Sequence, residues 1–142
     1  AVLAVFVAWS ALDFVLHGVI LSSIYKETAH FWRPEAEMKI VLMYVVSLLM
    51  AVFFTMLYAA LVQPKRLLSG FRYGMLTGLM MGVSMGLGSY CVMPIPASLA
   101  WGWFLGTWVE MIVAGVIVGL IIDKTLECPF SKTDEGKSCS TC

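Results

Sequence analysis

Hydrophobic residues fill four long intervals of this chain, and nearly all charged residues lie between or after these intervals. The apolar intervals are residues 1–24, 40–63, 73–92 and 99–122, and the charged segments are residues 26–39, 65–72 and 123–137. Each interval has about the 20 residues that an α-helix needs to cross about 30 Å of hydrocarbon at 1.5 Å per residue. The pattern predicts an all-α membrane protein, an antiparallel bundle of four transmembrane helices.

Two regions follow from this pattern. Residues 1–123 are predicted to form the transmembrane domain, and residues 124–142 a short polar, cysteine-containing C-terminal tail. A cleaved signal peptide is the alternative for the first interval, but the interval is too long for such a segment and contains Asp13 and His17. The chain does not begin with Met, so we expect residues ahead of Ala1.

Composition supports the membrane assignment. Hydrophobic residues make up 61% of the chain and charged residues 13%, about half the charged share of a soluble domain. The net charge is zero, and the charged segments flank apolar intervals instead of forming a basic patch. Lipid is therefore the expected surrounding, and nucleic acid is excluded as a partner.

Basic residues near the span ends predict the orientation, because cytoplasmic loops are enriched in Lys and Arg. Six lie on the side shared by both termini, and three lie on the other side. The six are Lys65, Arg66, Arg72, Lys124, Lys132 and Lys137, and the three are Lys26, Arg33 and Lys39. Both termini are predicted to be cytoplasmic. Tyr25, Phe31, Trp32, Trp101 and Trp103 are expected at the headgroup level of the opposite side.

The first interval contains an acid and an imidazole, Asp13 and His17, on one predicted helix face with Ser10. The fourth interval contains one acid, Glu110. Asp13 lies 12 residues from Ala1 and Glu110 lies 13 residues from Asp123. At 1.5 Å per residue both acids are about 18–20 Å from the cytoplasmic side, so we expect them to meet. The same count predicts a second polar layer, formed by His17, Ser47, Ser89 and Thr107.

Three interpretations of these polar layers remain open. Two carboxyl groups in a medium of low dielectric cannot both be ionised cheaply, so we expect at least one to hold a proton. The layers can be a hydrogen-bonded plug that fixes helix register, or a proton- or cation-linked transport site. Cofactor ligation by His17 is the third interpretation, but a haem usually needs a second axial ligand and His30 is the only other histidine.

Glycines recur every four residues in the third interval, at Gly74, Gly78, Gly82 and Gly86, with Gly70 ahead of them. The fourth interval has a second set, formed by Gly102, Gly106, Gly115 and Gly119. Small residues at this spacing let helix backbones approach closely in lipid. We therefore expect close helix packing at both sets. A groove for a bound lipid, a pigment or a permeating solute is the alternative.

The tail contains three cysteines, Cys128, Cys139 and Cys142, and the last two form a C-x-x-C motif. Closed zinc sites and iron–sulfur clusters need four ligands, and the tail supplies three thiols without a histidine. We therefore predict free thiols and no metal site for a cytoplasmic tail; a disulfide is the alternative if the topology is inverted. No cofactor is predicted.

These segments resemble those of a known kind of protein. The segments on which the resemblance depends are residues 9–18, Trp32-Arg33-Pro34, residues 88–96 at the end of the glycine series, and residues 106–121. Together they resemble small, uncharacterised four-span proteins of the bacterial inner membrane. The resemblance covers about residues 1–123 and implies that membrane as the location; it implies no activity.

Two functional hypotheses follow, with a more distant third. The sequence has no nucleophile or metal constellation, so we expect no enzyme. The first hypothesis is a non-catalytic membrane subunit that packs against other subunits of a larger, for example bioenergetic, complex through its glycine-rich faces. The alternative is a small, homo-oligomeric proton- or cation-linked transporter or channel that uses Asp13, His17 and Glu110. The third is a redox or metal-binding subunit.

Overall fold

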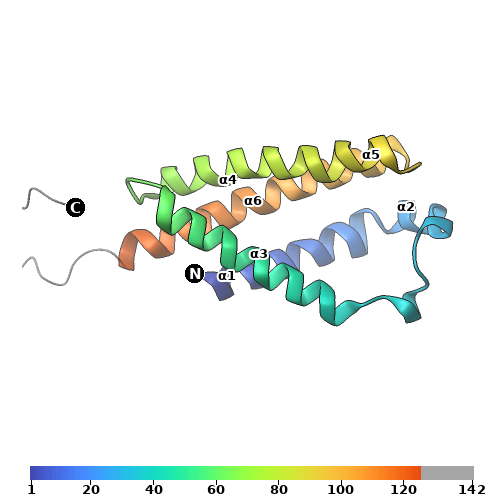
Figure 1. Ribbon diagram of the computed structural model, residues 1–142, viewed down its shortest axis with the longest axis horizontal. Helices are drawn as coiled ribbons and strands as arrows, with labels where there is room; N and C mark the ends of the chain where they lie inside the picture. Colours follow the sequence, from blue (N-terminus) through green and yellow to red (C-terminus); the bar gives the residue numbers. More distant parts are fainter. Residues whose placement is uncertain (126–142) are drawn as a thin grey trace, which may run out of the picture.

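The structure, a computed structural model, describes residues 1–125, with all their side chains except those of Glu35 and residues 123–125. Within these residues every regular element is helical, and four helices are long and apolar enough to cross a membrane. They cover Val2–Ile20, Ile40–Leu61, Leu67–Val92 and Ala97–Ile122. The all-α four-helix membrane fold is thereby confirmed (Figure 1). The tail cysteines Cys128, Cys139 and Cys142 lie outside the described residues.

Two of the four spans contain π-helical turns. The first span consists of α1 (Val2–Asp13) and the π-helical segment η1 (Phe14–Ile20), and α2 (Ser22–Glu27) continues beyond it. The third span consists of α4 (Leu67–Gly82), the π-helical segment η4 (Val83–Gly88) and α5 (Ser89–Val92). The second and fourth spans are the uninterrupted helices α3 (Ile40–Leu61) and α6 (Ala97–Thr125). Short 3₁₀ turns, η2 (Ala29–Phe31) and η3 (Glu35–Glu37), connect α2 to α3.

The third span differs most from its predicted bounds, because α4 begins at Leu67 and not at residue 73. Arg72 lies inside this helix with its side chain exposed. A long Arg stem can lie along apolar surface while its guanidinium reaches the headgroups, so the charge does not end the helix. The first span ends at Ile20, four residues before its predicted end, where the chain bends at Leu21.

The most extensive helix contact joins α4 to α6, which run side by side (Figure 1). A Cβ added to Gly70 or Gly74 would collide with the backbone carbonyl of Gly115 or Met111, and one added to Gly86 would lie 2.5 Å from the carbonyl oxygen of Ala100. The two helices therefore touch backbone to backbone. The glycines of α4 are covered by α6 of the same chain, which leaves them no surface for another subunit or a pigment.

A core of buried apolar side chains joins α1, α3 and α6. Its fully or nearly fully buried members are Val5, Trp9, Ala51, Phe54, Tyr58, Met111, Ala114 and Val118. The Trp9 ring packs edge to face on Phe54 at a centroid distance of 5.5 Å. The Tyr73 hydroxyl of α4 donates a hydrogen bond to the backbone oxygen of Phe54 at 3.0 Å, which ties the α4–α6 pair to α3.

The first third of α3, at its Ile40 end, has few neighbours in the chain. Residues 40–46 are all exposed, on every face of about two successive helical turns, and Tyr44 still meets the Phe6 ring of α1 at a centroid distance of 6.5 Å. Figure 1 shows the cause, because α3 crosses α1 obliquely and its Ile40 end runs away from α4 and α6. This end of the helix is left to lipid or to another chain.

Candidate functional site

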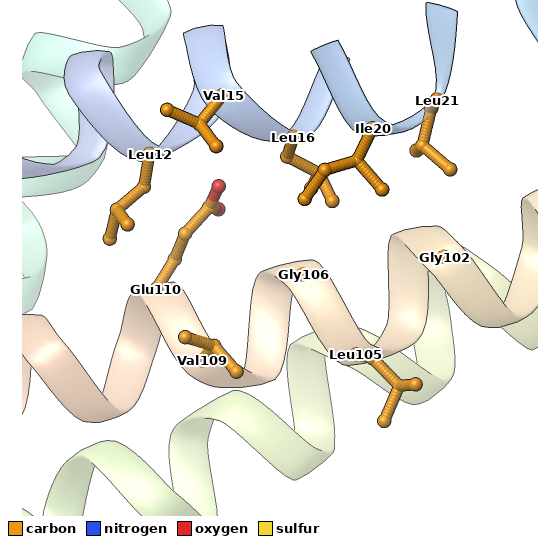
Figure 2. A pocket seen from close by; sticks show the side chains of 10 residues that line it. All are labelled: Leu12, Val15, Leu16, Ile20, Leu21, Gly102, Leu105, Gly106, Val109 and Glu110. Atoms are coloured by element: carbon orange, nitrogen blue, oxygen red, sulfur yellow. The ribbon is translucent and has the colours of Figure 1, made fainter. Parts of the chain in front are cut away.

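Glu110 extends from α6 toward the first span, between Leu12 and Leu16 (Figure 2). Its Oε1 atom is buried and has no hydrogen-bond partner in the described part of the chain. Its backbone oxygen accepts a hydrogen bond of 2.9 Å from the Trp9 indole, which holds α1 at this level of α6. The carboxyl group thus lies between two spans in apolar surroundings.

Asp13, at the end of α1, interacts electrostatically with Glu110. The structure therefore brings together the two acids that the residue count placed at one depth. Asp13 also faces the next turn of its own span, where its Oδ1 lies 3.8 Å from Nε2 of His17. The Asp13 side chain is 44% exposed and the His17 side chain 39% exposed, so one edge of this group is open in the single chain.

His17 has its hydrogen-bond partner further along the chain, at Tyr25 of α2. The Tyr25 hydroxyl lies 2.7 Å from Nδ1 of His17 and accepts a hydrogen bond of 2.6 Å from the Trp103 indole of α6. Because the Trp103 N–H can only donate, the Tyr25 hydroxyl proton is free to point to Nδ1 of a neutral His17. Nε2 then carries the ring proton and faces Asp13. Five residues thus follow one another from the middle of the first span to α2, and we call them the polar row: Glu110 of α6, Asp13 and His17 of the first span, Tyr25 of α2 and Trp103 of α6.

The π-helical turns of η1 explain why Tyr25 reaches His17. In a regular α-helix a residue eight positions further on is rotated by about 80° from the starting face. A π-turn holds one residue more than an α-turn, as in the bond from the Leu21 amide to the Leu16 carbonyl at 2.9 Å. One extra residue reduces the offset between His17 and Tyr25 to about 20°. The sequence pattern contains no signal for this widening, so Tyr25 was not predicted as a member of the site.

Aromatic side chains pack around the end of the polar row that contains Tyr25 and Trp103. Trp32 packs edge to face on Tyr25 and on Trp103, at centroid distances of 5.5 and 5.9 Å. The Trp32 indole donates a hydrogen bond of 2.9 Å to the Thr28 hydroxyl. Trp103 is buried among these partners, whereas the neighbouring Trp101 is exposed, so of the two only Trp101 presents its ring on the surface. Packing against Tyr25 and Trp32 draws Trp103 into the bundle.

The remaining residues of the predicted second layer are not hydrogen-bonded to His17. Ser47, Ser89 and Thr107 are half-buried, and in the described residues no side-chain hydrogen bond joins any of them to His17. Ser10 is bonded locally, with its hydroxyl donating to the Phe6 carbonyl at 2.9 Å.

A cleft opens between η1 and α6 next to Glu110 (Figure 2). It has a volume of about 330 Å³ and, apart from Glu110, is lined by apolar side chains and glycines. The lining residues are Leu12, Val15, Leu16, Ile20, Leu21, Gly102, Leu105, Gly106, Val109 and Glu110. We call it the η1–α6 cleft. Leu16 and Leu21 lie in the notches left by Gly106 and Gly102, where a Cβ would collide with these leucines.

The two halves of the α6 glycine set face different helices. Gly102 and Gly106 lie against the first span, whereas Gly115 and Gly119 lie against α4 and the chain just before it. Nine residues separate Gly106 from Gly115, which corresponds to about 900° and therefore to opposite sides of a helix. The set is two notched surfaces rather than one stripe.

Metal ligation finds no support in the described residues, where no three His, Cys, Asp or Glu side chains lie close enough to share an ion. His30 packs on the Phe31 ring at a centroid distance of 3.9 Å, away from His17. Cys91 is an exposed free thiol.

Burial raises the pKa of the Tyr25 hydroxyl above its ordinary value of 10.0, the nearby Asp13 charge adds to the rise, and the hydrogen bond from Trp103 opposes it. The contribution of this group to stability is therefore complete below the ordinary pKa and is lost as the pH rises through the higher value of the folded protein. We expect a difference ultraviolet titration of the wild type against Tyr25→Phe to place this ionisation above pH 10.0. An ionisation at or below that pH would contradict the buried position of the hydroxyl.

No protein-family model, curated protein or solved structure matches this chain. The functional proposal therefore depends on the polar row, the η1–α6 cleft and the exposed surfaces described above.

Proposed function

We propose that this protein is a small, oligomeric, proton- or cation-linked membrane transporter. The observation that supports the proposal is the polar row. In it, Glu110, Asp13, His17 and Tyr25 follow one another from the middle of the first span to α2. Ionisable residues inside a membrane are costly, and such rows are typical of proton relays and ion pathways. A single polar pair would be enough to fix helix register, whereas this row connects the middle of a span to its end.

The hydrogen bonds give the row a direction for proton transfer. A proton that arrives at the Tyr25 hydroxyl can pass to Nδ1 of His17, 2.7 Å away. The imidazolium formed in this way carries its second proton on Nε2, 3.8 Å from Asp13, where the carboxylate stabilises the positive charge. Asp13 in turn interacts with Glu110. The row therefore links the outer end of the span to a carboxyl pair at its middle.

Partial exposure of the row supports an oligomer. Asp13 and His17 are about two-fifths exposed within a membrane-spanning helix, where contact with lipid tails is unfavourable for both. A second copy placed with two-fold symmetry presents the same acid and base, so each can face its opposite in the partner. We propose a homo-oligomer in the bacterial inner membrane with both termini cytoplasmic, as the distribution of Lys and Arg indicates.

The proposal is tested by electrical recording from protein-containing vesicles on a solid support after a pH step. We expect the wild type to give a protein-dependent current, and the double variant Asp13→Asn with Glu110→Gln to fall to the level of protein-free vesicles. These substitutions remove the titrating groups and keep the side-chain shapes. Glu27→Gln is the matched control, since Glu27 is exposed at the end of α2, outside the span.

Two outcomes would count against transport. A wild-type current equal to that of protein-free vesicles would contradict the proposal, as would a double variant that conducts like the wild type. Light scattering on the same samples checks that the double variant keeps the size of the wild-type oligomer, so that loss of current is not loss of assembly.

A second candidate function is a non-catalytic subunit of a larger membrane complex. The observation that favours it is the first third of α3, at its Ile40 end, where residues 40–46 are exposed on every face. A partner chain would cover this surface. Native mass spectrometry of the protein purified from membranes separates the two candidates, because a subunit should retain a different chain and a transporter only copies of itself.

A further inference from the structure

We propose that the η1–α6 cleft binds a lipophilic cation, a molecule with an apolar body and one ammonium-like charge, and that Glu110 holds the charge. The inference names a substrate class for the transporter proposed above. It rests on that proposal for movement across the membrane but not for binding.

The walls of the cleft suit an apolar body. Apart from Glu110, all its lining residues are aliphatic or glycine, and its volume of about 330 Å³ lies at the lower end of the range of small-molecule sites. Val15, Ile20, Leu105 and Val109 are exposed at its rim. Because these rim residues belong to membrane-spanning helices, the cleft opens toward lipid. A ligand that dissolves in the bilayer therefore has direct access.

The two acids beside the cleft determine whether it favours a positively or a negatively charged ligand. Glu110 aims its carboxyl group into the space between the helices (Figure 2), where it interacts with Asp13 by charge and by a side-chain hydrogen bond, while its buried Oε1 has no hydrogen-bond partner in the described residues. Asp13 adds a second acid nearby. The spans on both sides, residues 2–20 and 97–122, contain no Lys or Arg. The acid pair carries negative charge whenever one of its members is ionised, so a cation in the cleft would be attracted, whereas an anion would be repelled and would find no Lys or Arg in these two spans.

Protons should compete with the cation. The titratable groups that face Glu110 from the first span are Asp13 and, one turn beyond, His17. On the other side of α6, the Tyr73 hydroxyl of α4 is bonded to the Phe54 carbonyl and does not face the cleft. Protonation of either acid removes negative charge, and protonation of His17 adds positive charge. Each of these changes weakens cation binding as the pH falls.

The test uses radiolabelled tetraphenylphosphonium, with tetraphenylborate as an anion of the same shape. Both are incubated with the purified full-length protein in lipid nanodiscs. We expect saturable binding of the phosphonium, weaker binding at lower pH, and no saturable binding of the borate. Glu110→Gln should reduce the affinity at least about tenfold, because it removes the charge partner inside an apolar site. Glu27→Gln, which changes an exposed acid outside the spans, should bind like the wild type.

A second variant tests the cleft itself. Val15→Trp places a large side chain at the exposed rim, where it does not disturb the buried core, and should also reduce phosphonium affinity at least about tenfold by filling the space. Equal binding of phosphonium and borate, or unchanged binding in both variants, would overturn the inference. Binding without a pH-driven current would leave the cleft assignment standing and refute transport. A current without phosphonium binding would support transport and refute the cleft assignment.

Discussion

Replacing Gly74 by Leu is expected to destroy the contact between α4 and α6. The first side-chain carbon would collide with the Met111 carbonyl oxygen and lie 3.0 Å from the Ile112 Cα, so only a backbone shift can relieve the clash. A larger side chain must push the helices apart along their most extensive contact. We expect a loss of more than about 3 kcal/mol in the free energy of unfolding, beyond the usual cost of overpacking a core.

Gly88→Leu is the matched control. Gly88 is exposed, and the nearest atom to an added Cβ there is the Val83 carbonyl oxygen at 3.8 Å, an ordinary contact distance. Unfolding in mixed micelles by increasing amounts of sodium dodecyl sulfate, followed by circular dichroism, gives both free energies. If Gly74→Leu and Gly88→Leu unfold at the same detergent fraction, the backbone contact between α4 and α6 is not present in the protein.

Trp9→Ala is the second substitution with a large expected effect. The Trp9 side chain is 5% exposed, packs on Phe54 of α3, and donates a hydrogen bond to the backbone of Glu110 in α6. Its removal leaves a cavity where three helices meet. We expect a loss of about 3 kcal/mol, the low end of the range for aqueous cores, because lipid is as apolar as the protein interior, so packing and the hydrogen bond are lost without a gain from transfer to water.

Two further variants separate the parts of this effect. Trp9→Phe keeps an aromatic ring but removes the hydrogen bond, and should cost about 1 kcal/mol. Trp101→Ala removes a tryptophan that is 52% exposed, and should change stability by less than about 0.5 kcal/mol. The same detergent titration measures all three. A Trp9→Ala protein as stable as Trp101→Ala would show that Trp9 does not join the helices.

The number of spans and the meeting of the acids follow from simple properties of the sequence. Apolar intervals of sufficient length predict helices because lipid offers no partner for unpaired backbone groups. Counting residues along two antiparallel helices placed Asp13 and Glu110 at one depth, since the rise per residue is constant. Neither inference depends on details of packing, and the structure has four spans and an electrostatic contact between these acids.

The rest of the site depends on departures from regular helices. His17 meets Tyr25 because of the wide turns in η1 and the bend at Leu21, for which the sequence has no recognised pattern. A residue count also gives no information about crossing angles such as that between α3 and α1, because these follow from side-chain packing (Figure 1). Tyr25, Trp32 and Trp103 were expected at one level by residue type, but their direct contacts were not predicted because the path of the connection that carries Tyr25 and Trp32 was unknown.

The leucine-filled notches of α6 have a consequence for how the helices can move. On the α4 side, the backbone of α6 contacts the backbone of α4, which cannot adjust as a side chain can. Against the first span α6 meets Leu16 and Leu21, whose branched ends can change rotamer. Because the Trp9 hydrogen bond and the buried core hold α1 on α6, tilting should cost least where η1 meets α6, with α4, α6 and α1 travelling as one rigid body. Such a rocking motion would widen and narrow the space beside Glu110 in step with the displacement.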